Sequence, residues 1–291
     1  MYQLLGKVTR NPHRLNKMQK WIRRIPQPLI YYVCLIISWA YYLLAPKTKK
    51  TIQNQINAIL QKKESCRNYF FHLTLMLIEI LFLSQRHLTP QNSIFNIEGE
   101  KYIDQALEKG KGTILYTTHT GNFFYYYWYL SQKYPCLTVA TAGSLELRPL
   151  YEIFQSHGCN GLDYDQESPL KIWRALRQHL KNNGVVVLLG DFYRPNFPTS
   201  YLFGRETKTP AGAAVLSLEN GIPLLPFYGY RHKKFQHHII IKPPIQFSKD
   251  FSPKDPAAIQ ELNHILEELI ISKPSQWFYW FNIKERFSDP L

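Results

Sequence analysis

The first 63 residues contain no aspartate or glutamate, although they carry twelve of the chain's 35 lysines and arginines. The first acidic residue is Glu64, and the remaining chain carries 23 basic and 21 acidic residues. The formal charge of +14 therefore comes almost wholly from the N-terminal segment. Because an apolar stretch adjoins this basic segment, the pattern favours an anionic membrane surface over nucleic acid as a partner. A basic arm that only improves solubility is the alternative.

Cysteine is also scarce, and no C-x-x-C pair occurs. The four cysteines are widely separated: Cys34, Cys66, Cys136 and Cys159. Scattered thiols suit a reducing compartment and argue against a disulfide framework or a cysteine-based zinc site. Three histidines, His232, His237 and His238, lie near one another, but no carboxylate or cysteine joins them. We therefore predict no metal site and no cofactor.

Other familiar motifs are missing. Residues 108–113, EKGKGT, lack the spacing and the Ser or Thr of a phosphate-binding P-loop. Residues 163–167, DYDQE, carry alternate acids but lack the glycine and the terminal glutamate of a calcium-binding loop. No serine-centred nucleophile elbow is present. These absences argue against a P-loop enzyme, a calcium-binding loop and a serine hydrolase.

The longest apolar stretch, LIYYVCLIISWAYYLLA, spans residues 29–45, which are 17 uncharged residues between Pro28 and Pro46. This length lies at the lower end of the range for a membrane span, about 17 to 25 residues. The stretch is not typical of a signal peptide, because Pro46 and lysines follow it in place of small residues. Basic residues on both sides favour a helix that enters one leaflet and returns to the same side. A helix buried in a soluble core is the alternative.

We therefore divide the chain into a basic membrane anchor over residues 1–63, with its apolar helix at 29–45, and a larger part over residues 64–291. The sequence at residues 65–84 predicts a second apolar helix, which can pair with the first as a hairpin on the membrane.

From about Ile94 onward, predicted strands alternate with predicted helices. The strands are expected at residues 113–118, 136–142, 185–190, 224–230 and 237–244. The helices are expected at about 101–109, 147–157, 168–182, 210–220 and 256–272. This alternation predicts an α/β fold in which helices cover both faces of a sheet.

The stretch YTTHTGNFFYYYW, residues 116–128, carries the strongest candidate for a functional residue. His119 follows a predicted strand, where α/β folds place their ligands. Gly121 and Asn122 then open a predicted helix, whose free N–H groups can stabilise an oxyanion. Neutral histidine can accept a proton from an attacking hydroxyl or amine near pH 7, but a purely structural histidine is the alternative. The aromatic run at 123–129 fits either a buried core or the wall of an acyl-chain groove.

Three ordered segments carry a family resemblance. They are HTGNFF, then the stretch from VVVLLGDFYRP through FGRETKTPAGAAVLSLENGIPLLPFYGYR, and finally PSQWFYWFNIKERF. In this order and spacing they resemble the lipid A late acyltransferase family, part of the lysophospholipid acyltransferase superfamily, from about Cys66 to Phe287. The resemblance implies a glycerolipid acyltransferase-like α/β fold, with a central, mixed, mostly parallel sheet flanked by helices and an N-terminal membrane-associated helical segment.

The resemblance also implies a catalytic base. In this family a histidine activates the acceptor, and an acid five residues later assists it, in the pattern H-x4-D/E. His119 matches the base, but Phe124 stands where the family has its acid. Asp191, which matches an aspartate of the family's second motif, is the best substitute. Weaker candidates are Glu146, Asp163 and Asp165. A non-catalytic lipid-binding or scaffold protein on the same fold is the alternative function.

The resemblance further implies that Arg205, Lys208 and Thr209 lie beside the acyl-donor and phosphate site; two solvated loop cations are the alternative. By the same resemblance, the protein is an acyltransferase of lipid A or lipopolysaccharide biosynthesis. The expected donor is an acyl carrier protein or coenzyme A thioester, and the expected acceptor is a hydroxyl or amine of a lipid A-like glycolipid or another amphiphile. The expected location is the cytoplasmic face of the cell inner membrane, with no nucleic acid as partner.

Overall fold

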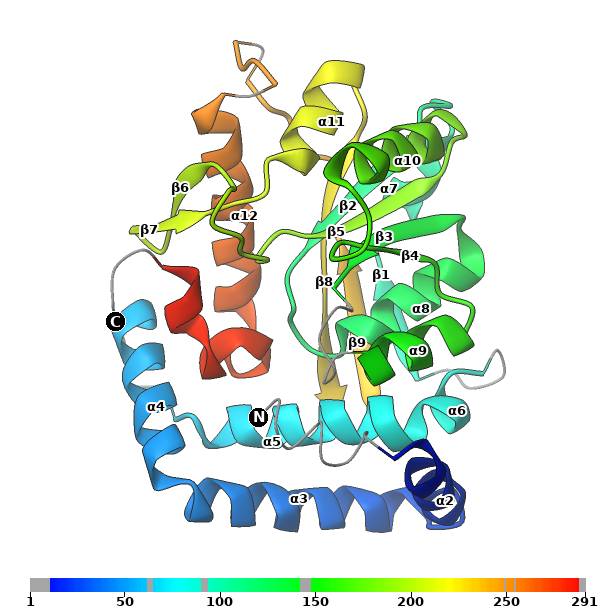
Figure 1. Ribbon diagram of the computed structural model, residues 1–291, viewed down its shortest axis with the longest axis vertical. Coiled ribbons are helices and arrows are strands. Elements are labelled where there is room, and N and C mark those ends of the chain that lie inside the picture. The colour runs from blue at the N-terminus through cyan, green and yellow to red at the C-terminus, as the bar shows by residue number, and fades with distance from the viewer. Residues whose placement is uncertain are drawn as a thin grey trace.

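A computed structural model of the protein describes residues 11–61, 65–89, 94–141, 148–248, 250–253 and 255–287. The N-terminal third is helical and forms one end of the molecule (Figure 1). Its elements are α2 (Pro12–Ile22), α3 (Gln27–Leu44), α4 (Pro46–Leu60), α5 (Arg67–Ile78), the π-helix η1 (Glu79–Leu83) and α6 (Ser84–His87). Proline in the first turn of α2, α3 and α4 favours helix initiation at those points, because its missing N–H would be unpaired there in any case.

A seven-stranded sheet forms the centre of the rest of the chain, in the order β1-β9-β8-β2-β5-β3-β4. The strands are β1 (Phe95–Glu98), β2 (Thr113–Thr117), β3 (Cys136–Ala140), β4 (Gly161–Asp163), β5 (Val185–Leu189), β8 (Leu224–Lys233) and β9 (Gln236–Ile241). Every neighbouring pair is parallel except β8 and β9, which form an antiparallel hairpin. The central strand β5 is wholly apolar and every residue of β2 is buried, as is typical of strands covered on both faces.

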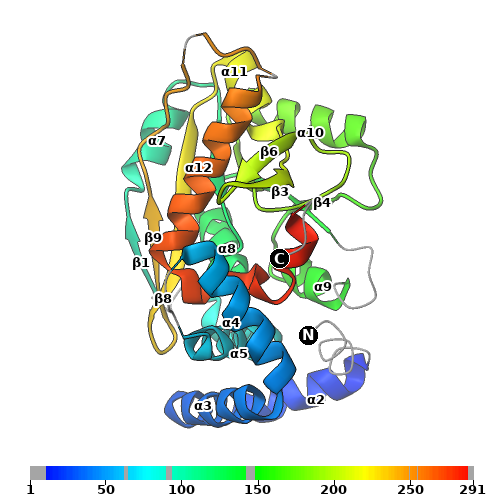
Figure 2. The same cartoon turned by 90° about the vertical axis from the view of Figure 1, so that its left-hand side faces the viewer.

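Helices cover both faces of this sheet. They are α7 (Lys101–Leu107), α8 (Phe123–Lys133), α9 (Arg148–Ser156), α10 (Pro169–Lys181), α11 (Gly212–Asn220) and α12 (Pro256–Ser272). The helices α8 and α9 lie on one side of the sheet, and α11 and α12 lie on the other (Figures 1 and 2). Short 3₁₀ turns follow α12: η2 (Pro274–Gln276), η3 (Phe278–Phe281) and η4 (Ile283–Arg286).

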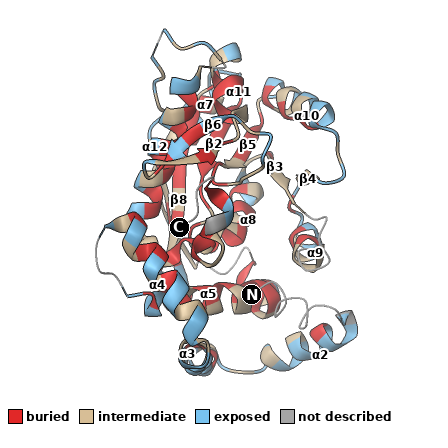
Figure 3. Cartoon of the chain, turned by 60° about the vertical axis from the view of Figure 1, so that its left-hand side comes forward, coloured by how far each residue is buried: buried red, intermediate tan, exposed pale blue. Residues whose placement is uncertain are grey.

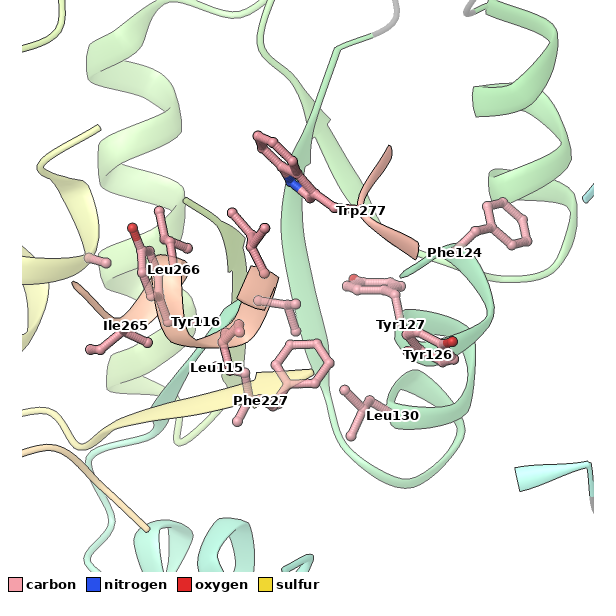
Figure 4. Packing of buried hydrophobic residues seen from close by; sticks show 14 of the residues in the cluster. Leu115, Tyr116, Phe124, Tyr126, Tyr127, Leu130, Phe227, Ile265, Leu266 and Trp277 are labelled. Carbon is pink, nitrogen blue, oxygen red and sulfur yellow. The ribbon is translucent and has the colours of Figure 1, made fainter. Parts of the chain in front are cut away.

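The core between these layers is built largely from aromatic and branched side chains. Ile265 and Leu266 of α12 lie near Tyr116 of β2, whereas Tyr126 and Tyr127 of α8 lie across the strands from them (Figure 4). Successive residues of a strand point to opposite faces, so β2 contributes side chains to both layers. The predicted α/β fold with a mixed, mostly parallel sheet is therefore confirmed.

The expected elements of the α/β part are all present within a few residues of their predicted bounds. The sequence analysis did not predict the short strands β1 and β4, nor a two-stranded hairpin of β6 (Thr199–Leu202) and β7 (Arg205–Lys208). It also expected one continuous helix at 65–84, where the structure has α5 followed by the π-helix η1. Both β1 and β4 are four residues or shorter, which leaves too little pattern to detect.

Two described helical stretches are long and apolar enough to cross a membrane, judged by length and composition: Gln27–Leu44 and Arg67–His87. They differ in burial, because 56% of the apolar window of the second is buried inside the protein but only 17% of the first. The second stretch is thus part of the packed core. The first, α3, buries only a narrow stripe, formed by Ile30, Cys34 and Ser38 at intervals of four residues.

The outer face of α3 is apolar and exposed at the end of the molecule (Figure 3). Its large exposed side chains are Leu29, Tyr32, Val33, Ile36, Ile37, Trp39, Leu43 and Leu44. A contiguous apolar face of this kind marks an interaction surface. The predicted boundary between residues 63 and 64 lies outside the described residues, and α4 on its N-terminal side already contributes Ile52 and Ile56 to the main core.

A buried polar cluster fastens the β6–β7 hairpin to α12. The Thr209 hydroxyl lies 2.8 Å from the Ser200 hydroxyl and donates to Asn263 Oδ1 at 3.0 Å. Asn263 Nδ2 in turn donates to Ser200 Oγ at 2.6 Å. All three side chains are buried, so each depends on the other two for its hydrogen bonds to other side chains.

Replacing Thr209 by valine keeps the shape of the side chain but leaves its partners in this cluster without the hydroxyl. We expect Thr209→Val to lower the free energy of unfolding by about 1–3 kcal/mol. Thr199→Val in the same hairpin is the matched control, because Thr199 is exposed, and its effect should stay within about 0.5 kcal/mol. Urea denaturation followed by tryptophan fluorescence measures both; equal effects would show that the cluster adds no stability.

Candidate active site

His119 and Asp191 meet at one edge of the sheet. His119 follows β2 and Asp191 follows β5, and these two strands are parallel neighbours, so their carboxyl ends lie side by side. His119 Nδ1 lies 2.6 Å from Asp191 Oδ1, and the His119 backbone N–H donates to Asp191 Oδ2 at 2.9 Å. The structure therefore brings together the base and the substitute acid that the sequence analysis proposed.

The environment of Asp191 keeps its carboxyl group ionised. Burial by itself would raise the pKa of Asp191, but the charge and hydrogen bond of His119, the charge of Arg286 and the Trp277 indole lower it below its usual value. The Trp277 Nε1–H donates to Asp191 Oδ2 at 2.8 Å. An ionised carboxylate only accepts hydrogen bonds, so the imidazole hydrogen is on Nδ1. In a neutral imidazole with this tautomer, Nε2 carries the lone pair that a general base needs.

Aromatic rings confine the imidazole on two sides. The ring centroids of Phe123 and Tyr279 each lie 4.7 Å from that of His119. The Tyr279 hydroxyl approaches His119 Nε2 at 3.4 Å, and the Arg286 guanidinium stacks on the Tyr279 ring, 3.2 Å from its centroid. Tyr279 and Arg286, like Trp277, belong to the third family-like segment, but the sequence analysis assigned them no role, because nothing in the sequence indicates that they approach His119.

The backbone after His119 is held by the C-terminal segment. The Gly121 N–H donates to the Gln276 carbonyl at 2.9 Å, and the Phe278 N–H donates to the His119 carbonyl at 2.8 Å. Gly121 has a φ of +64°, and a Cβ there would lie 2.3 Å from the Tyr126 hydroxyl. Glycine is therefore required for the turn that carries the histidine.

Asn122 connects this turn to the buried core. Its Oδ1 accepts from the Tyr125 N–H at 3.3 Å and so caps α8, and its own N–H donates to the Tyr126 hydroxyl at 3.0 Å. The amide groups of Gly121 and Asn122 thus both have acceptors inside the protein. In this arrangement they fix the turn, and their predicted role towards an oxyanion stays a prediction.

A second buried carboxylate, Glu79, holds the Asn122 side chain by a hydrogen bond. Glu79 begins the π-helix η1, and short π-helical turns inside α-helices are frequent at functional sites. Its Oε2 accepts from Asn122 Nδ2 at 2.9 Å, and its Oε1 accepts from Arg231 Nη1 at 2.7 Å and from His237 Nε2 at 3.0 Å. Burial alone would raise the pKa of Glu79, but Arg231 and His237 lower it well below its usual value.

An apolar cavity of about 720 Å³ lies beside the histidine and crosses the carboxyl ends of β2, β3 and β5. This volume is typical of small-molecule sites, about 300–1,000 Å³. Its apolar walls come from α5, η1, α8, α9 and α10 and include Met76, Leu77, Ile80, Phe124, Tyr127, Leu150, Phe154, Ile172, Trp173 and Leu176. His119, Tyr279 and Arg286 also line the cavity, so the imidazole faces a largely apolar space.

Phe124, in the position of the family's acid, forms part of the cavity wall. Its ring contacts Phe154 at a centroid distance of 5.5 Å. Of the weaker acid candidates, Asp165 accepts a hydrogen bond from Arg194, Asp163 lies 3.8 Å from Arg148, and Glu146 lies outside the described residues. Asp191 is thus the carboxylate that contacts His119 among the described candidates.

The three predicted substrate-binding residues lie outside the cavity wall. Thr209 is buried in the cluster with Ser200 and Asn263, Lys208 donates to Thr199 Oγ1 at 2.5 Å, and the Arg205 guanidinium lies 5.4 Å from the centre of the Phe287 ring. The cavity begins at the next residue, Pro210. Their role in substrate binding stays a prediction. Among the described residues, no group of three or more histidine, cysteine or acidic side chains is arranged to hold a metal ion.

Comparisons with known proteins agree on a class of enzyme. Residues 52–287 match the family described as bacterial lipid A biosynthesis acyltransferase. Two curated relatives, phosphatidylinositol mannoside acyltransferases of two Mycobacterium tuberculosis strains (H37Rv and CDC 1551), are each 30% identical over 142 residues. That match covers 45% of this chain and 42% of each relative, so the chain aligns with less than half of their length.

Among solved structures, the 1-acyl-sn-glycerophosphate acyltransferase PlsC of Thermotoga maritima is similar over 84% of this chain and 96% of its own, with 13% sequence identity and a TM-score of 0.40.

The Glu79 cluster yields a stability prediction. Glu79→Gln leaves the buried Arg231 guanidinium without its counter-charge, so we expect the free energy of unfolding to fall by about 3–5 kcal/mol. Glu268→Gln is the matched control, because Glu268 pairs with Lys242 on the surface, and its effect should stay below about 1 kcal/mol. Urea denaturation at pH 7 measures both. Similar losses in the two variants would contradict a special role of the buried pair.

Proposed function

The chain belongs to the bacterial lipid A biosynthesis acyltransferase family, and we propose that it transfers a fatty acyl group to a membrane lipid. The donor is a thioester of an acyl carrier protein or of coenzyme A. The acceptor is a hydroxyl or amine of a glycolipid or a similar amphiphile, reached from the cytoplasmic face of the inner membrane.

The observation that carries this proposal is the position of the His119–Asp191 pair on the wall of an apolar cavity. A buried, ionised aspartate fixes the imidazole so that Nε2 can accept a proton, and the cavity suits a fatty acyl chain. Together they fit a reaction in which an apolar donor is attacked by a hydroxyl or amine.

The chemistry follows from this geometry. The acceptor hydroxyl or amine gives its proton to His119 Nε2 as its oxygen or nitrogen bonds to the thioester carbon. Asp191 stabilises the imidazolium that forms and keeps its orientation. The tetrahedral intermediate then expels the thiolate, which recovers the proton from His119. No covalent intermediate on the protein is required.

Phe124 was the reason to consider a non-catalytic lipid-binding protein. Asp191 holds the imidazole at the nitrogen where the motif's acid would be needed, and Phe124 contributes apolar surface to the cavity. This contact between Asp191 and His119 supports catalysis in the absence of the motif's acid. Phe124 near the start of α8 then lines the acyl-chain site, whereas Tyr125 and Tyr126 are fully buried in the core.

For the donor, we propose that Arg205 and Lys208 contact phosphate groups. Acyl carrier protein and coenzyme A share the phosphopantetheine arm, and arginine and lysine are the usual phosphate partners. Both cations lie on the strand that leads directly into Pro210, where the cavity begins. For the acceptor, a glycolipid class is supported by the curated relatives, which are named as acyltransferases of phosphatidylinositol mannoside.

We propose that α3 rests in the membrane interface with its exposed apolar face. Helix α5 lies between α3 and the cavity. Leu75 of α5 packs with Ile30 and Cys34 of α3, whereas Met76 of α5 and Ile80 of the adjoining turn η1 line the cavity. The basic residues of α2 and α4 flank α3 at both ends and favour an anionic surface. A lipid acceptor in that surface therefore lies close to the site.

Removing either member of the pair should abolish most of the transfer. We expect His119→Ala to lower kcat by about 10²–10⁴ and Asp191→Asn to approach the same loss, because the imidazole loses its orienting acceptor. Release of free thiol from an acyl thioester, in the presence of a lipid extract, measures the rate. Asp104→Asn, which removes a surface carboxylate bonded to Tyr134, is the control. Equal activity of His119→Ala and wild type would refute the mechanism.

The membrane contact can be tested on the face of α3. Ile36 and Leu44 are 68% and 83% exposed, so the double variant Ile36→Glu with Leu44→Glu should keep its fold and move from the membrane fraction to the soluble fraction. Leu170→Glu is the matched control, because Leu170 is 56% exposed but lies on α10. Wild-type protein that is fully soluble at low salt without detergent would contradict the proposal.

A further inference from the structure

The proposed reaction needs a hydrogen-bond donor for the thioester carbonyl oxygen, which becomes negative as the acceptor attacks. Three backbone N–H groups of the turn that carries the base are already engaged. The His119 N–H donates to Asp191, the Gly121 N–H donates to the Gln276 carbonyl, and the Asn122 N–H donates to the Tyr126 hydroxyl. Freeing any of these three would break contacts that hold the turn, whereas a side chain that faces the cavity can donate without that cost.

Tyr279 places a hydroxyl at the required point. Its oxygen lies 3.4 Å from His119 Nε2, the atom to which the acceptor must hydrogen-bond, and its side chain lines the cavity. The carbonyl oxygen is one bond away from the carbon under attack. A donor this close to Nε2 is therefore within hydrogen-bond reach of that oxygen when the acceptor is in place. The η3 turn that carries Tyr279 is joined to the catalytic turn by the bond from the Phe278 N–H to the His119 carbonyl, so the two move together.

Arg286 gives Tyr279 a fixed and positively charged support. Its guanidinium stacks on the Tyr279 ring and donates through Nη1 to the backbone carbonyl of Asp191. Its Nε–H is buried and has no hydrogen-bond partner within the part of the chain that the structure describes. A buried cation beside the site stabilises negative charge on the substrate oxygen, because the apolar surroundings screen it weakly.

We propose that Tyr279 is a catalytic residue that binds the thioester carbonyl oxygen and stabilises the oxyanion, with Arg286 as its supporting charge. This inference rests on the proposed acyl transfer. As the acceptor oxygen or nitrogen bonds to the carbonyl carbon, its proton passes to His119 Nε2 and the π electron pair of the C=O bond moves to the oxygen. The Tyr279 O–H donates to that oxygen. The C=O bond then re-forms, the C–S bond breaks, and the thiolate leaves with the proton from His119.

The test is Tyr279→Phe, which removes the hydroxyl and keeps the ring that Arg286 contacts. With dodecanoyl-coenzyme A and a lipid extract as substrates, we expect kcat to fall about 10²–10³-fold, the loss typical of one oxyanion donor, while KM for the thioester stays nearly constant. A fluoroketone analogue of the thioester, whose hydrate resembles the tetrahedral intermediate, should bind the variant more weakly by a similar factor. A thermal midpoint close to that of wild type establishes that the variant is folded.

Tyr230→Phe is the matched control, because it also removes a phenol that hydrogen-bonds to a histidine, His238 at 2.9 Å, but on the β8–β9 hairpin outside the cavity. Its kcat should equal that of wild type. If Tyr279→Phe retains wild-type kcat, or loses activity through KM alone, the oxyanion role of Tyr279 is refuted while the acyl transfer of wild type still stands. If wild type releases no thiol from any carrier-protein or coenzyme A thioester, the proposed function fails, and this inference fails with it.

Discussion

The candidate site depends on one buried carboxylate. Asp191 accepts hydrogen bonds from the backbone and ring of His119 and from the indole of Trp277, and its backbone carbonyl accepts from Arg286. These contacts join the loops after two neighbouring strands to the C-terminal segment. A buried carboxylate is stable only when such donors surround it, so the requirement that Asp191 be satisfied also fixes the imidazole and the aromatic residues beside it.

Glu79 is a second buried carboxylate that is surrounded by hydrogen-bond donors. This carboxylate, paired with Arg231 and His237, holds the Asn122 side chain and therefore the start of α8. Glu79 is fully buried and lies at the start of the π-helical turn that follows α5. The turn that carries His119 is thus supported from two sides, by polar networks in which a carboxylate is the common acceptor. These networks hold the imidazole in place although Phe124 stands where the motif has its acid.

Helix α5 links the two apolar surfaces on which the proposed function depends. One side of it lines the cavity, and the other packs against α3, whose outer face is exposed. An acyl chain and a membrane lipid are both apolar at one end and polar at the other. A protein that joins them needs an apolar chamber and an apolar outer face close to the same base, and this arrangement supplies both.

Much of the fold could be predicted from the sequence, because local patterns encode it. The alternation of apolar strands with amphipathic helices predicted the α/β sheet, the uncharged residues 29–45 predicted α3, and the position of His119 at the end of a strand marked the site. The family-like segments also pointed to Asp191. The periodicity of apolar residues indicates which face of a helix or strand is buried, and it can be recognised without knowing which distant residues that face contacts.

Tertiary structure alone decided which polar groups meet. His119 and Asp191 are 72 residues apart, and Glu79 and Arg231 are 152 apart, so their pairing depends on strand order and on the path of the chain. Nothing local distinguishes a tyrosine of the C-terminal segment whose hydroxyl approaches the base from one that only fills the core. The physical reason is that burial makes unpaired polar groups costly, and the fold satisfies them with whichever residues its topology brings together.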